Sequence, residues 1–212
     1  MATIGFIKQK GGVGCSTLAF ATATEYTRAT WDVLVADLDT KQTTCFKRQV
    51  RRANRDFEPH INVQVFPTVD QAIRQADKYD LTILDTAPHA TRATAQVAEV
   101  ADLLIIPTGL ALDDLEPTVK LAHELRKNGI SQDKIAVAFC RTSGSEREYL
   151  EAKEYIEEAG YYHLDGQMHE KPAFRIASDL GRSPTESQYK GPREQAIQLV
   201  QSIIDRFNQI AG

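Results

Sequence analysis

Ten residues near the start of the chain decide its fold: Lys8-Gln9-Lys10-Gly11-Gly12-Val13-Gly14-Cys15-Ser16-Thr17. They follow an apolar run over residues 3–7, typical of a strand, and lead into an alanine-rich run over residues 18–30, typical of a helix. Glycines at such a junction let successive backbone N–H groups point inward around an anion, and the helix dipole adds to the attraction. The stretch therefore predicts a phosphate-binding loop, with the Ser16 hydroxyl placed to bind the magnesium of a nucleotide.

The loop departs from the standard pattern G-x-x-x-x-G-K-[ST] at two positions. Gln9 stands where the pattern has glycine, and Cys15 stands where it has lysine. That lysine reaches the β- and γ-phosphates, so its absence bears directly on catalysis. Losing one donor or cation of this kind commonly costs a factor of about 10²–10³ in rate. A thiol at a helix N-terminus is also a candidate for redox sensing, because the dipole lowers its pKa.

Length and composition favour one ordinary globular domain. The chain has 212 residues, of which 42% are hydrophobic and 25% charged. A net charge of −4 excludes a uniformly basic nucleic-acid binder but leaves room for a local basic patch. The sequence contains no apolar run of about 18 residues, so it predicts no membrane span, and it shows no secretory leader before the first strand. The three scattered cysteines form no C-x-x-C pair, which favours a reduced, cytoplasmic setting.

Short apolar runs alternate with helical patterns along the whole chain. The predicted strands cover residues 3–7, 33–37, 61–66, 81–85, 103–107, 134–140 and 161–164. The predicted helices cover residues 16–29, 42–54, 69–78, 91–101, 114–128, 146–159, 173–180 and 192–210. This alternation predicts a single α/β domain over residues 1–212, with a doubly wound, mainly parallel sheet and helices on both faces. Its ligands are expected beyond the carboxyl ends of the strands.

Carboxylates follow two of these strands. Asp85 ends the apolar strand 81–85, a pattern typical of a carboxylate that holds magnesium, often through water. Asp37 and Asp39 end the second strand two residues apart. They are candidates for the same site; alternatively, Asp39 caps the next helix while Asp37 is satisfied at the strand end.

Together these motifs resemble the ParA/MinD family of deviant Walker-A P-loop ATPases. The loop resembles K-G-G-x-G-K-[ST], and residues 37–42 resemble D-x-D-P-Q. Residues 85–88 resemble the D-T-P-P switch segment, and residues 102–113 resemble a strand and turn of the family. Residues 167–175 and 181–183 resemble the short ParF-like, VirC-type plasmid branch. The resemblance implies a P-loop ATPase fold without an N-terminal helix-turn-helix domain.

The resemblance also implies roles for individual residues. Lys10 would be the signature lysine that crosses a nucleotide-sandwich dimer, and Asp39 would position the attacking water, so both are assigned as catalytic. Ser16 and Asp85 would hold Mg²⁺. The residues expected to bind ATP or ADP are Lys10, Gly11, Gly12, Val13, Gly14, Cys15, Ser16, Thr17, Asp37 and Arg141.

A basic stretch is a candidate for DNA contact. Its cations recur at helical spacing, and no acidic residue occurs between positions 40 and 55. The candidates are Lys47, Arg48, Arg51, Arg52 and Arg55, with Arg175 and Arg182 as a second patch near the C-terminus. Such phosphate contacts would be sensitive to salt and blind to sequence. The alternatives are a solvated helix face or arginines that reach a partner subunit.

The sequence thus favours a plasmid partition or DNA segregation ATPase. The resemblance implies a nucleotide-dependent homodimer, nonspecific DNA, a small centromere-binding adaptor protein, no membrane, and a place on the nucleoid. Cys15 leaves three readings open: a nucleotide binder with slow or absent hydrolysis, an ATPase in which Lys10 supplies the charge, or an engineered substitution. The alternative function is a catalytically dead nucleotide-binding or structural scaffold of the same fold, which assists conjugation or cargo positioning.

Overall fold

A computed structural model describes residues 2–89 and 91–211 and shows the alternation of strands and helices that the sequence predicts. The strands are β1 (Ala2–Phe6), β2 (Val33–Asp37), β3 (Asn62–Val65), β4 (Leu81–Asp85), β5 (Leu103–Thr108), β6 (Ile135–Thr142) and β7 (Tyr162–His169). The α-helices are α1 (Cys15–Arg28), α2 (Thr44–Ala53), α3 (Val69–Ala76), α4 (Thr91–Val100), α5 (Leu112–Lys127), α6 (Glu146–Glu158), α7 (Pro172–Asp179) and α8 (Lys190–Ala211). Two 3₁₀ turns, η1 (Gln132–Lys134) and η2 (Pro184–Glu186), complete the elements.

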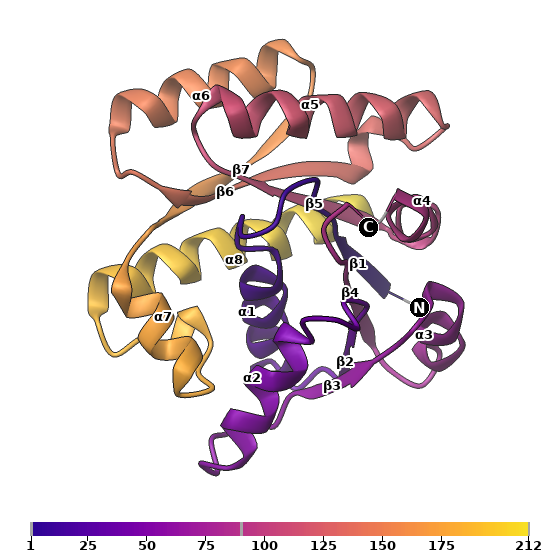
Figure 1. Ribbon diagram of the computed structural model, residues 1–212, viewed down its shortest axis with the longest axis vertical. Helices are drawn as coiled ribbons and strands as arrows, with labels where there is room; N and C mark the ends of the chain where they lie inside the picture. Colours follow the sequence, from indigo (N-terminus) through magenta and orange to yellow (C-terminus); the bar gives the residue numbers. More distant parts are fainter. Residues whose placement is uncertain (1, 90, 212) are drawn as a thin grey trace.

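The strands form one parallel sheet in the order β3-β2-β4-β1-β5-β6-β7 (Figure 1). β1 lies at its centre, between β4 and β5. Phe6 at the end of β1 pairs with Asp85, and Asp85 pairs with Asp37 on its other side. The segments that follow these strands therefore meet at one edge of the sheet, which is where doubly wound folds bind ligands.

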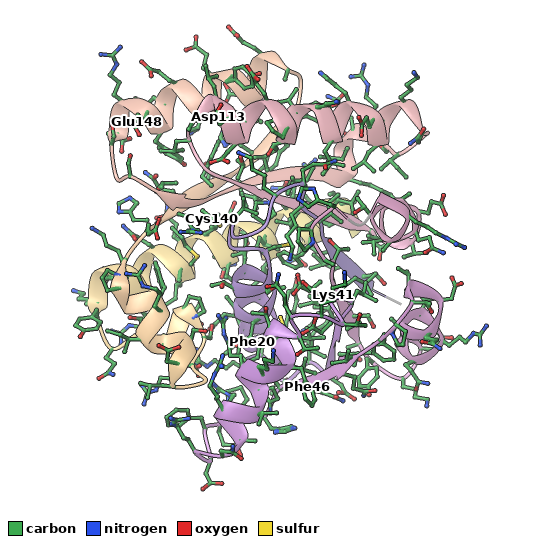
Figure 2. All side chains as sticks on the ribbon, viewed as in Figure 1. Phe20, Lys41, Phe46, Asp113, Cys140 and Glu148 are labelled. Atoms are coloured by element: carbon green, nitrogen blue, oxygen red, sulfur yellow. The ribbon has the colours of Figure 1, made fainter. Side chains whose placement is uncertain are left out.

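Helices cover both faces of the sheet: α1, α2, α7 and α8 cover one, and α3 to α6 cover the other (Figure 1). Strand side chains alternate between the two cores. In β2, Val35 packs in the core on the α1 side, whereas Leu34 and Ala36 pack in the core on the opposite side. The fully buried Phe20 of α1, labelled in Figure 2, belongs to the same core as Val35. A strand that is buried on both faces has a nearly continuous apolar sequence, which is why these strands were predictable.

The predicted fold class is confirmed, and the last strand is twice as long as predicted, whereas the other strands agree with their predicted lengths to within two residues. The last strand, predicted over residues 161–164, continues to His169. Asp165, Gly166 and Gln167 interrupt its apolar pattern, but β7 pairs only with β6 and is partly exposed. Gly166 has a φ of 88°, next to an irregular register between the two strands. An irregular edge strand needs fewer apolar residues than a central one, so its polar end could not be recognised.

Within the part of the chain that the structure describes, no helix combines the length and the apolar character that a membrane crossing requires. The longest helix, α8, instead buries one stripe, including Ala196, Leu199 and Ile203, in the core on the α1 side.

Candidate nucleotide-binding site

The glycine loop adopts the conformation that its sequence predicts. Gly12 and Gly14 have φ values of 82° and 93°, in the left-handed region that glycine enters without strain. Space is also limited there: a Cβ atom on Gly14 would lie 3.2 Å from the Cβ of Cys140, and one on Gly12 would lie 3.1 Å from Nη1 of Arg141. The loop therefore lies closely against the end of β6 and leads directly into α1 at Cys15.

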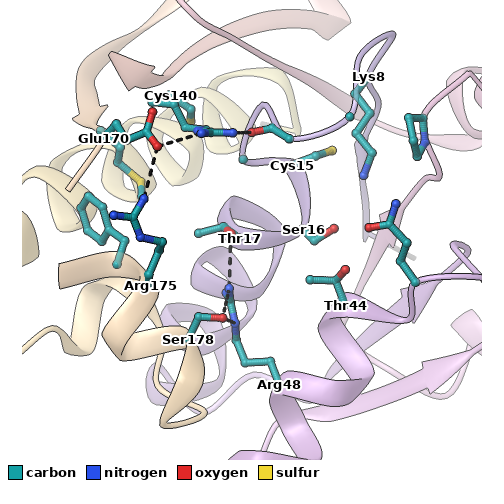
Figure 3. Close-up of a pocket in the computed structure, with 18 of the residues that line it drawn as sticks. Lys8, Cys15, Ser16, Thr17, Thr44, Arg48, Cys140, Glu170, Arg175 and Ser178 are labelled. Atoms are coloured by element: carbon teal, nitrogen blue, oxygen red, sulfur yellow. Dashed lines mark hydrogen bonds and ion pairs between the residues drawn. The ribbon is translucent and has the colours of Figure 1, made fainter. Parts of the chain in front are cut away.

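A pocket of about 380 Å³ opens beside this loop (Figure 3). Its walls come from the loop, the connection between β2 and α2, the ends of β6 and β7, and α7. The predicted nucleotide-site residues that line it are Gly11, Gly12, Gly14, Cys15, Ser16, Thr17, Asp39 and Arg141. The volume lies within the range of about 300–1,000 Å³ that small-molecule sites occupy.

Arg141 joins the loop to the far wall of the pocket. Its guanidinium donates to the carbonyl oxygen of Gly12 over 2.6 Å and to Oε1 of Glu170 over 2.8 Å. The hydrogen bond from Arg141, with its charge, lowers the pKa of the Glu170 carboxyl. Arg141 itself has a φ of 55°, so the chain turns sharply after the buried part of β6. The turn places this predicted nucleotide-binding residue at the pocket.

Asp37 and Asp39 both accept backbone hydrogen bonds. The buried Asp37 carboxylate accepts from the N–H groups of Asp39 and Phe46, each over 3.2 Å, and so caps the start of α2. Burial and the nearby Asp85 raise the pKa of Asp37 to about 6. Asp39 accepts from the N–H of Gln42 over 3.0 Å and also lines the pocket. The capping role belongs mainly to Asp37, and Asp39 combines a turn contact with access to the pocket.

Asp85, at the end of β4, is fully buried and has an incompletely satisfied carboxylate. Its Oδ2 atom accepts from the Cys45 thiol over 3.4 Å, whereas Oδ1 has no hydrogen-bond partner among the described residues and lies 3.5 Å from Nζ of Lys8. Within the described ranges, no group of three or more His, Cys, Asp or Glu side chains forms a metal site. Asp85 and the pocket-lining Ser16 hydroxyl fit magnesium that arrives with a nucleotide, because Mg²⁺ needs only one or two protein oxygens beside the phosphates.

Cys15 is not a reactive thiol in this structure. Its side chain is 2% exposed, and burial raises the pKa of the thiol well above its ordinary value despite the opposing effect of Lys8. The thiol is therefore protonated at neutral pH, and the nucleophilic thiolate is not available. The helix-dipole argument for redox sensing is wrong here, because desolvation outweighs the dipole.

Lys10 points away from the pocket. Its ammonium donates to Oδ1 of Asp114 over 2.9 Å and to the carbonyl oxygen of Asp113 over 2.5 Å, at the start of α5 (Figure 2). The hydrogen bond to Asp114 raises the pKa of Lys10. Lys10 is 43% exposed and, like Val13, does not line the pocket. The expected signature lysine thus contacts the start of α5, whereas most of the other loop residues line the pocket.

The basic residues of α2 do not form one outward face. Arg48 and Arg52 are 3% and 0% exposed, so both are removed from the surface. Arg48 lines the pocket and donates to Oγ1 of Thr17 over 3.3 Å and to Oγ of Ser178 over 2.9 Å. Their burial contradicts the interpretation of these two arginines as DNA contacts. The apolar Phe46 and Val50 of α2 are exposed instead, so the apolar spacing of this helix does not show which side faces inward.

The other predicted DNA contacts remain accessible to different degrees. Lys47 and Arg55 are exposed, and Arg51 is half-buried. Arg175 is exposed beside Glu170 and lines the pocket, and Arg182 stacks on the ring of Phe57.

Several pocket residues escaped the sequence analysis. Lys8 belongs to the decisive stretch, but the phosphate-loop pattern gives no role to its position. Most of the others follow β2 and β7, whose places in the sheet are not readable from the sequence. These further lining residues are Gln42, Thr44, His169, Lys171, Phe174 and Ser178.

No family model and no curated protein matches the sequence, but solved structures resemble the fold. MinD of Pyrococcus horikoshii, complexed with Mg-ADP, has a TM-score of 0.74 at 18% identity, covering 95% of both chains. A candidate plasmid partition protein of Borrelia burgdorferi, bound to AMPPNP, has a TM-score of 0.73 at 17% identity, covering 98% of both chains. The MinC:MinD complex of Aquifex aeolicus gives a TM-score of 0.75 at 13% identity, covering 97% of this chain and 96% of the other. The chain therefore has the fold of MinD and of ParA-type ATPases.

Proposed function

We propose that this chain is a ParA-type ATPase for plasmid partition or DNA segregation, and that it binds Mg-ATP in the pocket beside the glycine loop. One observation carries the proposal: left-handed Gly12 and Gly14 lead into α1 at the edge of the sheet where the buried Asp85 ends β4 beside β1. A loop of this kind binds phosphate, and the acidic residue at the end of a neighbouring strand fits its magnesium. Solved structures of this fold include complexes with Mg-ADP and AMPPNP, which supports the choice of ligand.

The loop amides and the N-terminal end of α1 would hold the phosphates. Ser16 and Asp85 would hold the magnesium ion, which neutralises the charge that develops on the phosphate oxygens during transfer. Asp39, on the pocket wall, would orient the attacking water by accepting a hydrogen bond from it. Arg141 would fix the loop through Gly12 while its charge faces the nucleotide.

Dimerisation would depend on Lys10. Its ammonium lies on the surface at the start of α5, where a second copy that meets the loop face can draw it from Asp114. A phosphate group is a stronger partner for an exposed ammonium than one partly solvated carboxylate, since it carries more charge. We therefore propose a face-to-face dimer that forms with ATP.

The exposed side of α2 is the proposed surface for nonspecific DNA. Lys47 and Arg51 remain there after Arg48 and Arg52 are excluded, Arg55 lies in the turn that follows α2, and Arg175 and Arg182 are further candidates. Binding of this kind would place the protein on the nucleoid, and a small centromere-binding adaptor would connect it to its plasmid. The adaptor is proposed from the sequence resemblance alone.

A second candidate function follows from Cys15. The absence of a lysine at that position lowers the expected rate of phosphoryl transfer. The same fold would then serve as a nucleotide-binding or structural scaffold. The two functions differ in whether nucleotide changes the assembly of the protein.

Sedimentation velocity with and without Mg-ATP tests the proposal. The ATPase interpretation predicts a dimer with ATP or a slowly hydrolysed analogue, a monomer with ADP, and loss of the dimer in Lys10→Ala. Glu116→Ala, which changes another exposed charge near the start of α5, serves as the matched control. Identical sedimentation of the wild type and Lys10→Ala in Mg-ATP would contradict the proposal and favour the scaffold.

A further inference from the structure

Lys8 is a buried lysine that has no role among the predicted nucleotide-binding, magnesium-binding and catalytic residues. It lies two residues beyond β1, at the centre of the sheet, and is only 7% exposed. Lysine is rarely buried without a specific reason, because removing its ammonium from water is costly. Its side chain extends beneath the loop toward Cys15 and Ser16 and lines the pocket (Figure 3).

The surroundings of Lys8 keep its charge. Burial alone lowers the pKa of the ammonium, but the acidic groups around it, among them the carboxylates of Asp85 and Asp39, raise it above its ordinary value. Lys8 thus remains an ammonium ion, 3.5 Å from Oδ1 of Asp85.

This charge lies in the same pocket as the loop position that lacks its lysine. The standard pattern places a lysine at position 15, where this chain has a neutral, buried cysteine. Cys15 and Ser16 line the pocket from the start of α1, and Lys8 lines the same pocket from a position just beyond β1. Three other cations that line the pocket contact protein groups there: Arg48 is bound to Thr17 and Ser178, and Arg141 and Arg175 to Glu170. Lys171 also lines the pocket, but it precedes α7 and is far from the loop in the chain.

We propose that Lys8 supplies the phosphate-binding cation of this site, so that the lysine of the loop has moved from the start of α1 to the end of β1. The inference rests on the proposed function, because it requires a nucleotide in the pocket. The lysine side chain is a flexible four-carbon chain that ends in an ammonium with three hydrogen-bond donors. In the described structure, only the carboxylate of Asp85 pairs with this ammonium. Its ammonium can therefore turn from Asp85 toward a phosphate, which would leave Asp85 available to magnesium.

A lysine swap tests this inference. Affinities for ATP, ADP and adenosine are measured for the wild type, Lys8→Met and the double variant Lys8→Met/Cys15→Lys. Lys8→Met should weaken ATP and ADP binding by about 10- to 100-fold, because a charge-assisted phosphate contact is lost, and leave adenosine binding unchanged. The double variant should regain the affinity for ATP, since it returns the ammonium to the same pocket. Lys134→Met, which removes a half-buried lysine at the start of β6, is the control and should bind like the wild type.

The outcomes separate the two proposals. A wild type that binds neither ATP nor ADP overturns the proposed function, and with it the role of Lys8. A wild type that binds ATP while Lys8→Met binds it equally well overturns the role of Lys8 alone. If Lys8→Met does not fold, the ammonium signal of Lys8 in ¹⁵N-lysine-labelled wild type decides: it should shift with Mg-ADP but not with adenosine. An unchanged signal at saturating Mg-ADP would contradict the inference.

Discussion

The buried guanidinium of Arg52 donates to both carboxylate oxygens of Glu186, over 2.6 and 2.9 Å, and so joins α2 to η2. Arg52 is fully buried, and its Nε donates to the carbonyl oxygen of Pro59. Glu186 is 10% exposed and also contacts Arg28. This pair fixes the helix that carries Arg48 against the segment between α7 and α8, and thereby shapes one side of the pocket.

Replacing Arg52 by leucine should therefore destabilise the protein strongly. The change removes the buried guanidinium from Glu186 and leaves it the partly exposed Arg28, so we expect the free energy of unfolding to fall by about 3 kcal/mol. Arg147→Leu, which removes an exposed arginine paired with Glu151, should lower the free energy of unfolding far less, because solvent screens this pair. Urea denaturation measures both. Equal effects of the two variants would show that the Arg52–Glu186 pair contributes little to the fold.

The raised pKa of Asp37 predicts a specific pH dependence of stability in the nucleotide-free protein. The folded state holds the Asp37 proton up to a pH of about 6, above the ordinary value of 3.8. The folded state thus binds the proton more tightly than the unfolded state, and its contribution is fully present below pH 4 and lost as the pH rises through 6. The loss amounts to about 3 kcal/mol.

Asp37→Asn should remove this contribution. The variant loses one of the two backbone hydrogen bonds, which lowers its free energy of unfolding at every pH. Between pH 4 and 7, however, this free energy should change less than that of the wild type. Urea unfolding of both proteins across this range gives the difference. Parallel curves would mean that Asp37 titrates normally.

The three thiols should not react while the protein is folded. Cys15, Cys45 and Cys140 are each at most 2% exposed, and burial raises the pKa of all three, that of Cys140 to about 12. A disulfide reagent such as dithionitrobenzoate should label them only as fast as the protein unfolds, and fully in denaturant. A thiol that reacts within seconds in native buffer would contradict the buried position of Cys15.

The contact between Lys10 and Asp114 should restrain dimer formation. Asp114→Ala releases the ammonium at the start of α5, so a lower ATP concentration should suffice for the dimer, by about 2- to 5-fold for an exposed ion pair. Sedimentation across an ATP titration measures the shift. A dimer that becomes weaker in Asp114→Ala would assign Asp114 to the interface rather than to restraint.

DNA binding should depend on the exposed residues of α2 and of the turn that follows it. Lys47→Glu/Arg55→Glu should weaken binding to duplex DNA of any sequence and reduce its dependence on salt, because phosphate contacts release counterions. Lys120→Glu/Lys127→Glu changes the net charge equally on α5, on the other face of the sheet, and should have little effect. Fluorescence anisotropy at several salt concentrations compares them. Equal losses in both variants would indicate a general effect of charge.

Local patterns made the fold and the loop predictable, whereas contacts between distant segments did not show in the sequence. Buried strands and the junction at Gly14 have local signatures, so their positions were predicted closely. The burial of Arg52 depends on Glu186, and the place of Arg48 depends on α7, neither of which is near in the chain. The burial of Lys8 likewise depends on its ion pair with Asp85, which lies far away in the chain and is brought close because β4 pairs with the central strand β1.

The most direct test of nucleotide binding in this pocket is the Mg-ATP affinity of the wild type beside two glycine variants. Gly14→Ala and Gly129→Ala both place a side chain at a φ near 90°, but a Cβ at Gly14 meets Cys140 in the site, whereas at Gly129 nothing lies within 4 Å. We predict that the wild type binds Mg-ATP with micromolar affinity, that Gly14→Ala lowers this affinity at least tenfold, and that Gly129→Ala leaves it unchanged. A tenfold loss of affinity corresponds to about 1.4 kcal/mol of binding free energy. No binding by the wild type at millimolar Mg-ATP, or equal binding by all three, would contradict the account.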